Sequence, residues 1–153
     1  MNKLQSLPWN NPRFKNWISV ARACQLMERA LSRKLQAIDL KPPHLDILAN
    51  LYRFPGISQQ DLARKLLVGR SNMSMLLPQL EKRGLLHRKP DASDKRVLRL
   101  ELTEEGKTLT ESALAIQMEV IEISMGAVSL AECDQVGDSM SKLVKRLLED
   151  ETA

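Results

Sequence analysis

Apolar side chains recur every three or four residues along most of this chain, which is the pattern of amphipathic helices. Serine, threonine and proline stand where such runs begin, and these residues favour the start of a helix. Glycine and proline stand where several runs end. The pattern predicts helices over 13–38, from Pro42 or Pro43 to the Pro55-Gly56 pair, over 58–67, over 70–83, and from Thr103 and from Ser129 onward.

The stretch LLHRKPDASDKRVLRLEL, residues 85–102, differs from the rest because its apolar flanks alternate with a period of two. This alternation predicts two strands, with Leu98, Leu100 and Leu102 on the packed face and Arg99 and Glu101 on the other. The residues PDASDKR are too many for a tight hairpin turn, so we expect a projecting loop. The basic side chains around this loop are His87, Arg88, Lys89, Lys95, Arg96 and Arg99.

The two short helices over 58–67 and 70–83 are separated by a break at Val68-Gly69, which is the layout of a helix-turn-helix. In this layout the start of the second helix meets base edges in the DNA major groove. Arginine pairs with guanine, asparagine with adenine, serine with either, and methionine packs on a thymine methyl group. The candidate base-reading residues are Arg70, Ser71, Asn72, Ser74 and Met75. The alternative is an ordinary amphipathic helix with a polar outer face.

A hairpin that directly follows a helix-turn-helix is a wing, and its presence favours the DNA-binding interpretation. An arginine at the tip of a wing can enter the minor groove, where the electrostatic potential is most negative. The predicted fold is mainly α, a winged helix-turn-helix in the order α-α-α-α-β-β-α-α. The helix that begins at Thr103 has two apolar stripes, so it needs two neighbours, one of which can belong to another chain.

Charge is unevenly distributed along the 153 residues, although the net charge is only +4. Residues 1–52 carry +5, residues 53–99 carry +7 and residues 100–153 carry −8. A basic middle suggests a polyanionic partner such as double-stranded DNA, and the acidic C-terminal segment is expected to stay away from that partner.

Several classes of protein are disfavoured by the sequence. No apolar run approaches the roughly 18 residues that span a bilayer, and the N-terminus lacks a signal-peptide pattern, so we expect a cytoplasmic protein that does not associate with a membrane. The 2 cysteines and 2 histidines lack the spacing of a metal or redox site, so no metal or cofactor is expected. Glycine-rich phosphate loops, G-x-S-x-G and paired carboxylates near a histidine are absent, so we do not expect an enzyme.

Two alternatives to a sequence-specific regulator stay open, because winged helices also serve as protein-interaction modules and as architectural DNA-binding proteins. A docking module should present apolar side chains on the outer face of 70–82. That face instead carries Arg70, Ser71, Asn72, Ser74, Gln79 and Lys82, with Met75 as the single apolar residue. This polarity favours DNA as the partner.

From Leu40 to Gly106 the chain resembles the multiple-antibiotic-resistance regulator (MarR) family of winged-helix transcription factors. The resemblance rests on ISQQDLARKL, RSNMSMLLPQLEKRGLL and RKPDASDKRVLRLELTEEG, in this order and spacing. The wing pattern D-x-x-D-x-R stands here as Asp91, Asp94 and Arg96. The flanking helices also match the family's order, so the likeness covers nearly the whole chain.

The resemblance implies a homodimer whose terminal helices interlock and a near-palindromic operator that is read by two recognition helices and flanked by two wings. It implies a transcriptional regulator, more often a repressor, and some relatives bind a small aromatic or carboxylate effector, although nothing in this sequence selects one. Carried over by motif, the five residues at the start of 70–83 read bases, Lys95 and Arg96 serve the wing, and Ser58 and Gln59 contact phosphate.

The resemblance also implies three segments of one interlocked fold. Residues 1–38 form an N-terminal arm and dimerisation helix, residues 39–102 form the DNA-binding lobe, and residues 103–153 form the C-terminal dimerisation helices. Two positions depart from the family pattern. Gly69 stands where a serine or aspartate cap is common, and Pro78 lies inside the recognition helix, where proline is expected to cause a kink and costs about 3 kcal/mol before compensation.

Cysteine, histidine and tryptophan residues outside the helix-turn-helix and wing are expected to have structural roles. Cys24 lies among apolar residues and is expected to be a buried thiol, because a reactive cysteine needs an electropositive setting. His44 follows two prolines and is expected in the first turn of a helix. Trp9 and Trp17 are expected in the core or in an interface.

Overall fold

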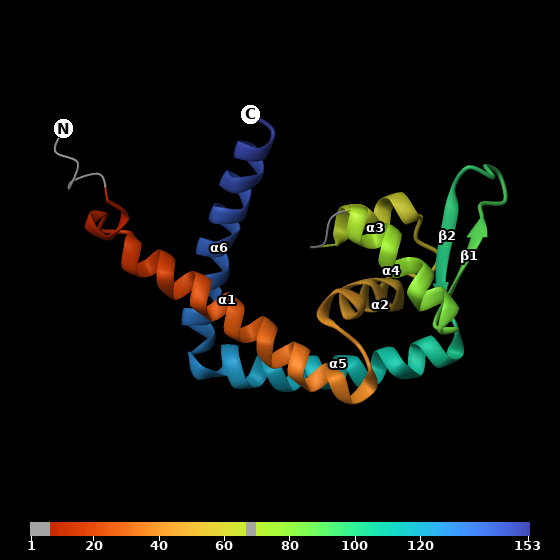
Figure 1. Cartoon of the computed structure of the whole chain (residues 1–153), viewed down its shortest axis with the longest axis horizontal. Helices are drawn as coiled ribbons and strands as arrows, with labels where there is room; N and C mark the ends of the chain where they lie inside the picture. Colours follow the sequence, from red (N-terminus) through yellow and green to blue (C-terminus); the bar gives the residue numbers. More distant parts are fainter. Residues whose placement is uncertain (1–6, 67–69) are drawn as a thin grey trace. The chain divides into compact units, whose positions relative to one another are not determined.

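The computed structural model describes residues 7–66 and 70–153, and its elements follow the predicted order (Figure 1). The fold is mainly α with one antiparallel sheet of 2 strands, which confirms the predicted fold class. Val68 and Gly69, the predicted break of the helix-turn-helix, lie outside the described residues. The elements are η2 (Pro8–Asn10), α1 (Phe14–Leu35), η3 (Gln36–Ile38), α2 (Pro42–Arg53), α3 (Gln59–Lys65), α4 (Arg70–Lys82), β1 (Leu86–Pro90), β2 (Leu98–Leu102), α5 (Glu104–Ser124), η4 (Met125–Ala127) and α6 (Leu130–Glu151).

The chain forms two compact units, Met1–Gln117 and Met118–Ala153. The first unit contains α1 to α4, the hairpin and most of α5. The second contains the end of α5, η4 and α6. Among the described residues, no single helix is both long and apolar enough to cross a bilayer.

The core of the first unit is built from the apolar faces of α2, α3, α4 and the hairpin. Helical spacing predicts an inward stripe on α4 made of Met73, Leu76, Leu77 and Leu80. This stripe is confirmed, and Leu77 and Leu80 are fully buried. Leu100 on β2 is also buried, so the predicted packed face of the second strand meets these helices. Full burial of one leucine side chain stabilises a fold by about 1.5–3 kcal/mol, so this cluster is the main favourable contribution to the stability of the unit. Its buried members are Leu35, Leu40, Leu45, Ile47, Leu48, Leu51, Leu62, Met73, Leu76, Leu77, Leu80, Leu85, Leu86, Leu100, Leu102 and Ala113.

Helical spacing predicts an apolar stripe on α2 made of Leu45, Leu48, Ala49 and Tyr52, and the structure differs from it. Ile47 and Leu51 are buried together with the predicted leucines, because α1, α3, α4 and β2 all pack against α2. Tyr52 was predicted to point inward, but it is exposed, and its hydroxyl donates a hydrogen bond to Oε1 of Glu111 at 2.9 Å. A tyrosine can pack part of its ring on a core while its hydroxyl stays at the surface, which explains the difference.

Hydrogen bonds at the N-caps confirm three predicted helix starts. Oγ of Ser58 accepts a bond from the N–H three residues later at 3.1 Å, and Ser129 caps α6 in the same way at 3.2 Å. Oγ of Thr103 accepts from the N–H of Gly106 at 3.0 Å, while the hydroxyl donates to the carbonyl of Gly84 at 2.6 Å. The start of α5 is therefore tied to the end of the α4 turn, where Gly84 adopts the left-handed conformation with φ 75°.

The wing hairpin is attached to the helices along its second strand. β1 and β2 pair as antiparallel strands over their whole length. The outer edge of β2 also pairs with the connection between α2 and α3, because the N–H of Leu100 donates to Ile57 at 2.9 Å and its carbonyl accepts from Gly56 at 3.0 Å. The base of the wing is thus part of the folded core and not a free hairpin.

The long helices α1 and α6 leave most of their apolar residues open in the single chain. None of the residues of α6 is buried, although Leu143, Val144 and Leu147 recur at helical spacing. Trp9 and Trp17 are 64% and 66% exposed, so they are not core residues of this chain, and their place in an interface stays a prediction.

The prediction of a buried Cys24 thiol is wrong for the single chain, in which Cys24 is exposed. The sequence around Cys24 is apolar, but Leu35 is the one residue of α1 that the described chain buries. An apolar helical neighbourhood therefore does not bury a thiol when no other element covers that part of the helix.

We predict opposite effects of alanine at two helical glycines. A Cβ on Gly106 would overlap the carbonyl oxygen of Leu85, so Gly106→Ala should lower the free energy of unfolding by about 1–3 kcal/mol. Nothing lies within 4 Å of a Cβ on Gly137, so Gly137→Ala should raise it by about 0.5–1 kcal/mol through helix propensity. Urea unfolding followed by circular dichroism measures both. Equal effects would contradict the close approach at Gly106.

Candidate nucleic-acid interface

The recognition helix α4 presents a polar outer face because its apolar stripe is buried. Asn72, Ser74 and Met75 are exposed, and Met75 keeps 59% of its surface accessible. The structure therefore places these three predicted base-reading residues together on one open surface. The side chains of Arg70 and Ser71 lie outside the described part of the chain.

Pro78 lies inside α4, as predicted, and it is exposed on the outer side of the helix. The helix is continuous across it, from Arg70 to Lys82. The predicted kink at Pro78 stays a prediction. Placing proline on the outer side keeps its ring out of the leucine core.

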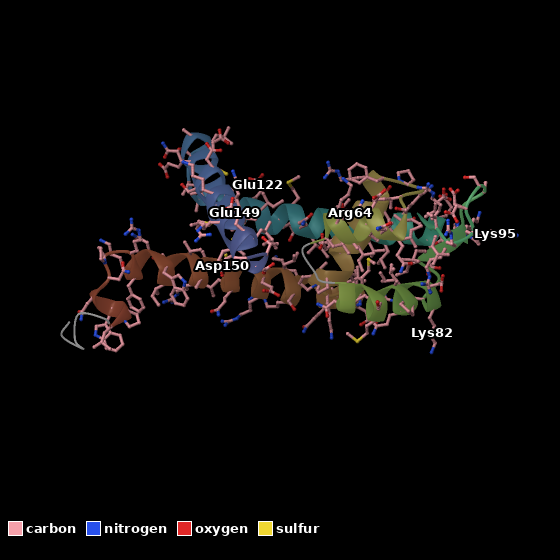
Figure 2. All side chains as sticks on the ribbon, turned by 90° about the horizontal axis from the view of Figure 1, so that it is seen from above. Arg64, Lys82, Lys95, Glu122, Glu149 and Asp150 are labelled. Carbon is pink, nitrogen blue, oxygen red and sulfur yellow. The ribbon has the colours of Figure 1, made fainter. Side chains whose placement is uncertain are left out.

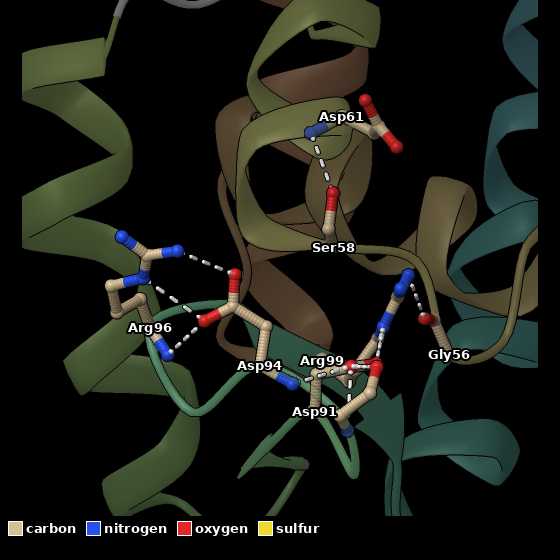
Figure 3. A network of polar contacts seen from close by, with 8 residues as sticks. Gly56, Ser58, Asp61, Asp91, Asp94, Arg96 and Arg99 are labelled. Carbon is tan, nitrogen blue, oxygen red and sulfur yellow. Dashed lines mark hydrogen bonds and ion pairs between the residues drawn. The ribbon is translucent and has the colours of Figure 1, made fainter.

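The wing loop is organised by the carboxylate of Asp91 (Figure 3). Oδ2 of Asp91 accepts hydrogen bonds from the hydroxyl of Ser93 at 2.7 Å, from the N–H of Ser93 at 3.0 Å and from the N–H of Asp94 at 3.1 Å. Oδ1 accepts from Nε of Arg99 at 3.0 Å. The hydroxyl of Ser93 and the guanidinium of Arg99 hold the pKa of Asp91 well below its usual range. A single ionised side chain thus gives the loop a defined shape.

Arg99 has a structural role that the sequence did not reveal. Besides its bond to Asp91, its NH1 group donates to the carbonyl of Gly56 at 3.4 Å. The side chain is half-exposed, but it connects the wing loop to the segment that precedes α3. Its charge is therefore shared with an internal carboxylate and is less available to DNA than the sequence alone indicated.

Arg96 lies at the tip of the wing and is 91% exposed. Oδ1 of Asp94 accepts from the N–H and from Nε of Arg96 at 3.0 and 3.1 Å, and Oδ2 accepts from NH2 at 3.2 Å. The bonds from Arg96 hold the pKa of Asp94 below its usual value. Exposed ion pairs contribute little net free energy, so Arg96 can leave Asp94 for a phosphate or a groove at small cost. Its neighbour Lys95 is exposed and has no acidic partner among the described residues.

An ion pair between Arg88 on β1 and Glu81 on α4 connects the wing with the recognition helix. Nε and NH2 of Arg88 donate to the two carboxylate oxygens at 3.2 and 3.1 Å. These bonds lower the pKa of Glu81 and raise that of Arg88. Because paired bonds between two planar groups are directional, they limit how the hairpin can tilt relative to α4. Sequence reasoning counted Arg88 only as one of the charges around the loop.

The predicted phosphate contacts Ser58 and Gln59 lie at the start of α3. Ser58 is buried, and its oxygen already accepts the capping bond, which leaves its hydroxyl proton as a donor. Oε1 of Gln59 is buried and has no hydrogen-bond partner among the described residues. Neither arrangement tests the predicted contact with phosphate.

Further basic side chains surround this surface. Figure 2 shows Arg64 on α3, Lys82 at the end of α4 and Lys95 on the wing, all projecting outward from the first unit. Arg64 is paired with Asp61 at 2.8 Å, whereas Lys82 and Lys95 have no acidic partner among the described residues. The acidic residues labelled in the same figure, Glu122, Glu149 and Asp150, belong to α5 and α6. The described residues contain no cluster of three or more histidine, cysteine, aspartate or glutamate side chains that could hold a metal ion.

Comparison with known proteins finds similarity to one family of transcription regulators. A sequence profile of the MarR family matches residues 38–97. Over these residues the chain is similar to the MarR family. The matched residues include both helices of the helix-turn-helix, β1 and the wing loop, and so they contain the polar face of α4 and Asp91, whereas Arg99 lies beyond them.

Solved structures of MarR-type regulators have a similar fold over most of the chain. The S. aureus MepR–DNA complex matches with a TM-score of 0.77 at 26% identity, covering 84% of this chain and 96% of that one. AbsC, a MarR family transcriptional regulator from Streptomyces coelicolor, matches with a TM-score of 0.81 at 20% identity, covering 88% and 93%.

The ligand-free form of RdhR, an organohalide-sensing transcriptional regulator, matches with a TM-score of 0.80 at 23% identity and covers 97% of this chain and 86% of that one. A 2,4-dichlorophenol-bound form of RdhR also matches. The matching family and these neighbours are transcription regulators and not enzymes, and this chain shares the fold of these DNA-binding regulators.

We predict that the Asp91 network stabilises the protein only while Asp91 is ionised. A lowered pKa in the folded state means that the stabilisation is present above the unfolded pKa, about 3.9, and is lost as pH falls through the depressed value. Asp91→Asn should therefore lower the thermal midpoint at pH 7, and the difference from the wild type should shrink below about pH 4.

Thermal unfolding of both proteins at a series of pH values measures this difference. Ser93→Ala removes the strongest bond to the carboxylate and should give a smaller loss of the same sign. A difference that stayed constant down to pH 3 would contradict a role for the ionised carboxylate.

Proposed function

We propose that this protein is a homodimeric, sequence-specific transcription repressor that binds a near-palindromic operator. The observation that carries the proposal is the surface formed by the polar face of α4 and the wing. Asn72, Ser74 and Met75 are open on α4, while Lys95 and Arg96 are open at the tip of an internally bonded loop. Rigid placement of hydrogen-bonding groups and cations suits a partner with fixed spacing, which duplex DNA has.

In this proposal the two elements have different tasks on DNA. Arg70, Ser71, Asn72, Ser74 and Met75 read base edges in the major groove, and Lys95 and Arg96 bind in or beside the adjacent minor groove. Ser58 and Gln59 contact phosphate at the start of α3. The structural likeness to MepR, which was solved with DNA, supports this assignment.

A second copy of the chain is the proposed partner of the long helices. The apolar side chains of α6 and the tryptophans near the start of α1 are exposed in the single chain, and large open apolar surfaces mark interaction sites. We propose the division into dimerisation segments 1–38 and 103–153 around a DNA-binding lobe, 39–102. In a dimer the two recognition helices would enter successive major grooves about 34 Å apart.

Release from the operator is proposed to follow from a change in the separation of the two lobes. A small effector shifts this equilibrium only by its different affinity for the two forms. A small aromatic or carboxylate effector is proposed, because RdhR was solved with 2,4-dichlorophenol. An open hollow lined by Pro8, Asn11, Arg13, Phe14 and Trp17 offers two aromatic rings and one guanidinium to such a molecule.

Selection of random DNA duplexes by the purified protein tests the proposal. We expect a near-palindromic sequence and binding that weakens steeply as salt is raised from 50 to about 200 mM. Enrichment of no sequence, with weak binding to every duplex, would favour an architectural role. No binding to any duplex would favour a protein-interaction module.

Paired variants at the wing and on the recognition helix should separate charge from base reading. Arg96→Ala should weaken binding to all sequences and lower the salt slope by about 1, because one phosphate contact is lost. Asn72→Ala should cost about 1–3 kcal/mol at one base position of each half-site and leave the salt slope unchanged. Binding titrations against a panel of single-base operator variants at two salt concentrations measure both. A uniform loss in Asn72→Ala would make Asn72 a phosphate contact.

A further inference from the structure

His44 lies in the first turn of α2 and is only 8% exposed. The backbone N–H of Lys41 donates to Nδ1 of the His44 ring at 3.1 Å. A ring nitrogen that accepts a hydrogen bond carries no proton, so the proton of the neutral ring is on Nε2. The N-terminus of α2 therefore fixes the tautomer of His44.

Nε2 of His44 is 3.3 Å from Oε1 of Gln79 on α4. Because Nε2 carries the proton, it has to donate, and the group that faces it has to be the amide oxygen of Gln79. The NH2 group of Gln79 then points away from His44. A backbone bond at the start of one helix thus decides the orientation of an amide on another helix, 35 positions later in the sequence.

Gln79 is part of the outer face of α4. It is exposed, and it follows Met75 by four positions and Asn72 by seven, which places the three on one stripe of the helix. Among the described residues, no other side chain is bonded to the Gln79 amide. Its two N–H donors are therefore available on the same surface as the candidate base-reading residues.

We propose that His44 is a positioning residue and that Gln79 is a specificity-determining residue of the operator, reading acceptor groups only. Glutamine reads adenine by directing its oxygen and its NH2 together at N6 and N7 of the base. Here the oxygen is directed at His44, so only the NH2 donors face DNA. They match the acceptors of guanine, O6 and N7, or O4 of thymine, and not the donor–acceptor pair of adenine. This inference rests on the proposed function.

The test compares the base preferences of four proteins by duplex selection, followed by titration of single-base operator variants. In the wild type, one position of each half-site should prefer guanine or thymine. Gln79→Ala should lose that preference by about 5- to 150-fold, the range expected for one base-specific contact. His44→Leu frees the amide to rotate, so the same position should shift toward adenine. Gln60→Ala, a change at an exposed glutamine on α3, should keep the wild-type preference.

Gln79→Glu keeps the fold testable if His44→Leu fails to fold, because residue 79 is exposed. A carboxylate still accepts from His44 but has no NH2 group, so this variant should lose the guanine or thymine preference. Its salt slope should equal that of the wild type, because the phosphate contacts are the same. Adenine preference at this position in the wild type would overturn the inference. So would an unchanged preference in Gln79→Ala. A wild type that enriches no sequence would overturn the proposed function itself.

Discussion

Burial of one face of α4 is the constraint on which the rest of the molecule depends. Met73, Leu76, Leu77 and Leu80 recur at helical spacing and lie in the leucine core, where α2 and α4 pack together. Because only one rotation of the helix about its axis buries all four, packing decides which residues face outward. The polar surface of α4 is the complement of its apolar stripe. Loss of the stripe would therefore remove the display of polar residues even if every one of them remained.

Apolar packing alone does not determine where the wing lies, because hydrophobic contacts are not directional. Hydrogen bonds and ion pairs are directional, and they fix the position of the wing. Arg88 binds both oxygens of Glu81 on α4, and Arg99 joins Asp91 in the loop to the carbonyl of Gly56 before α3. The wing is thereby held against two different parts of the helix-turn-helix. At the tip, Lys95 has no acidic partner among the described residues, and Arg96 has only an exposed one.

The helices at the two ends of the chain differ from the lobe between them in how far their apolar residues are buried. In the lobe, apolar residues find partners within the same chain, whereas α6 buries none of its residues and the tryptophans beside α1 stay exposed. Exposed apolar area on this scale favours association, since each buried Å² contributes about 25 cal/mol.

The sequence by itself determined the elements and their order, because helical stripes, strand alternation and caps such as Ser58 and Thr103 depend on near neighbours. It also carried the resemblance to the MarR family, through the D-x-x-D-x-R pattern and its flanks, and the profile match over residues 38–97 agrees with it. The roles of Asn72 and Arg96 on DNA stay predictions, since no bound DNA tests them.

Only the tertiary structure decided which charges are used internally and which side chains are covered. Arg99 and Gly56 are 43 positions apart, and His44 and Gln79 are 35 apart, so no local pattern records either contact. The same holds for Cys24, whose apolar neighbours suggested burial, and for Tyr52, which lies at the surface. A side chain is buried only where another helix or strand packs over it. The packing of the whole lobe decides where this happens, and the neighbours of the residue in the sequence do not.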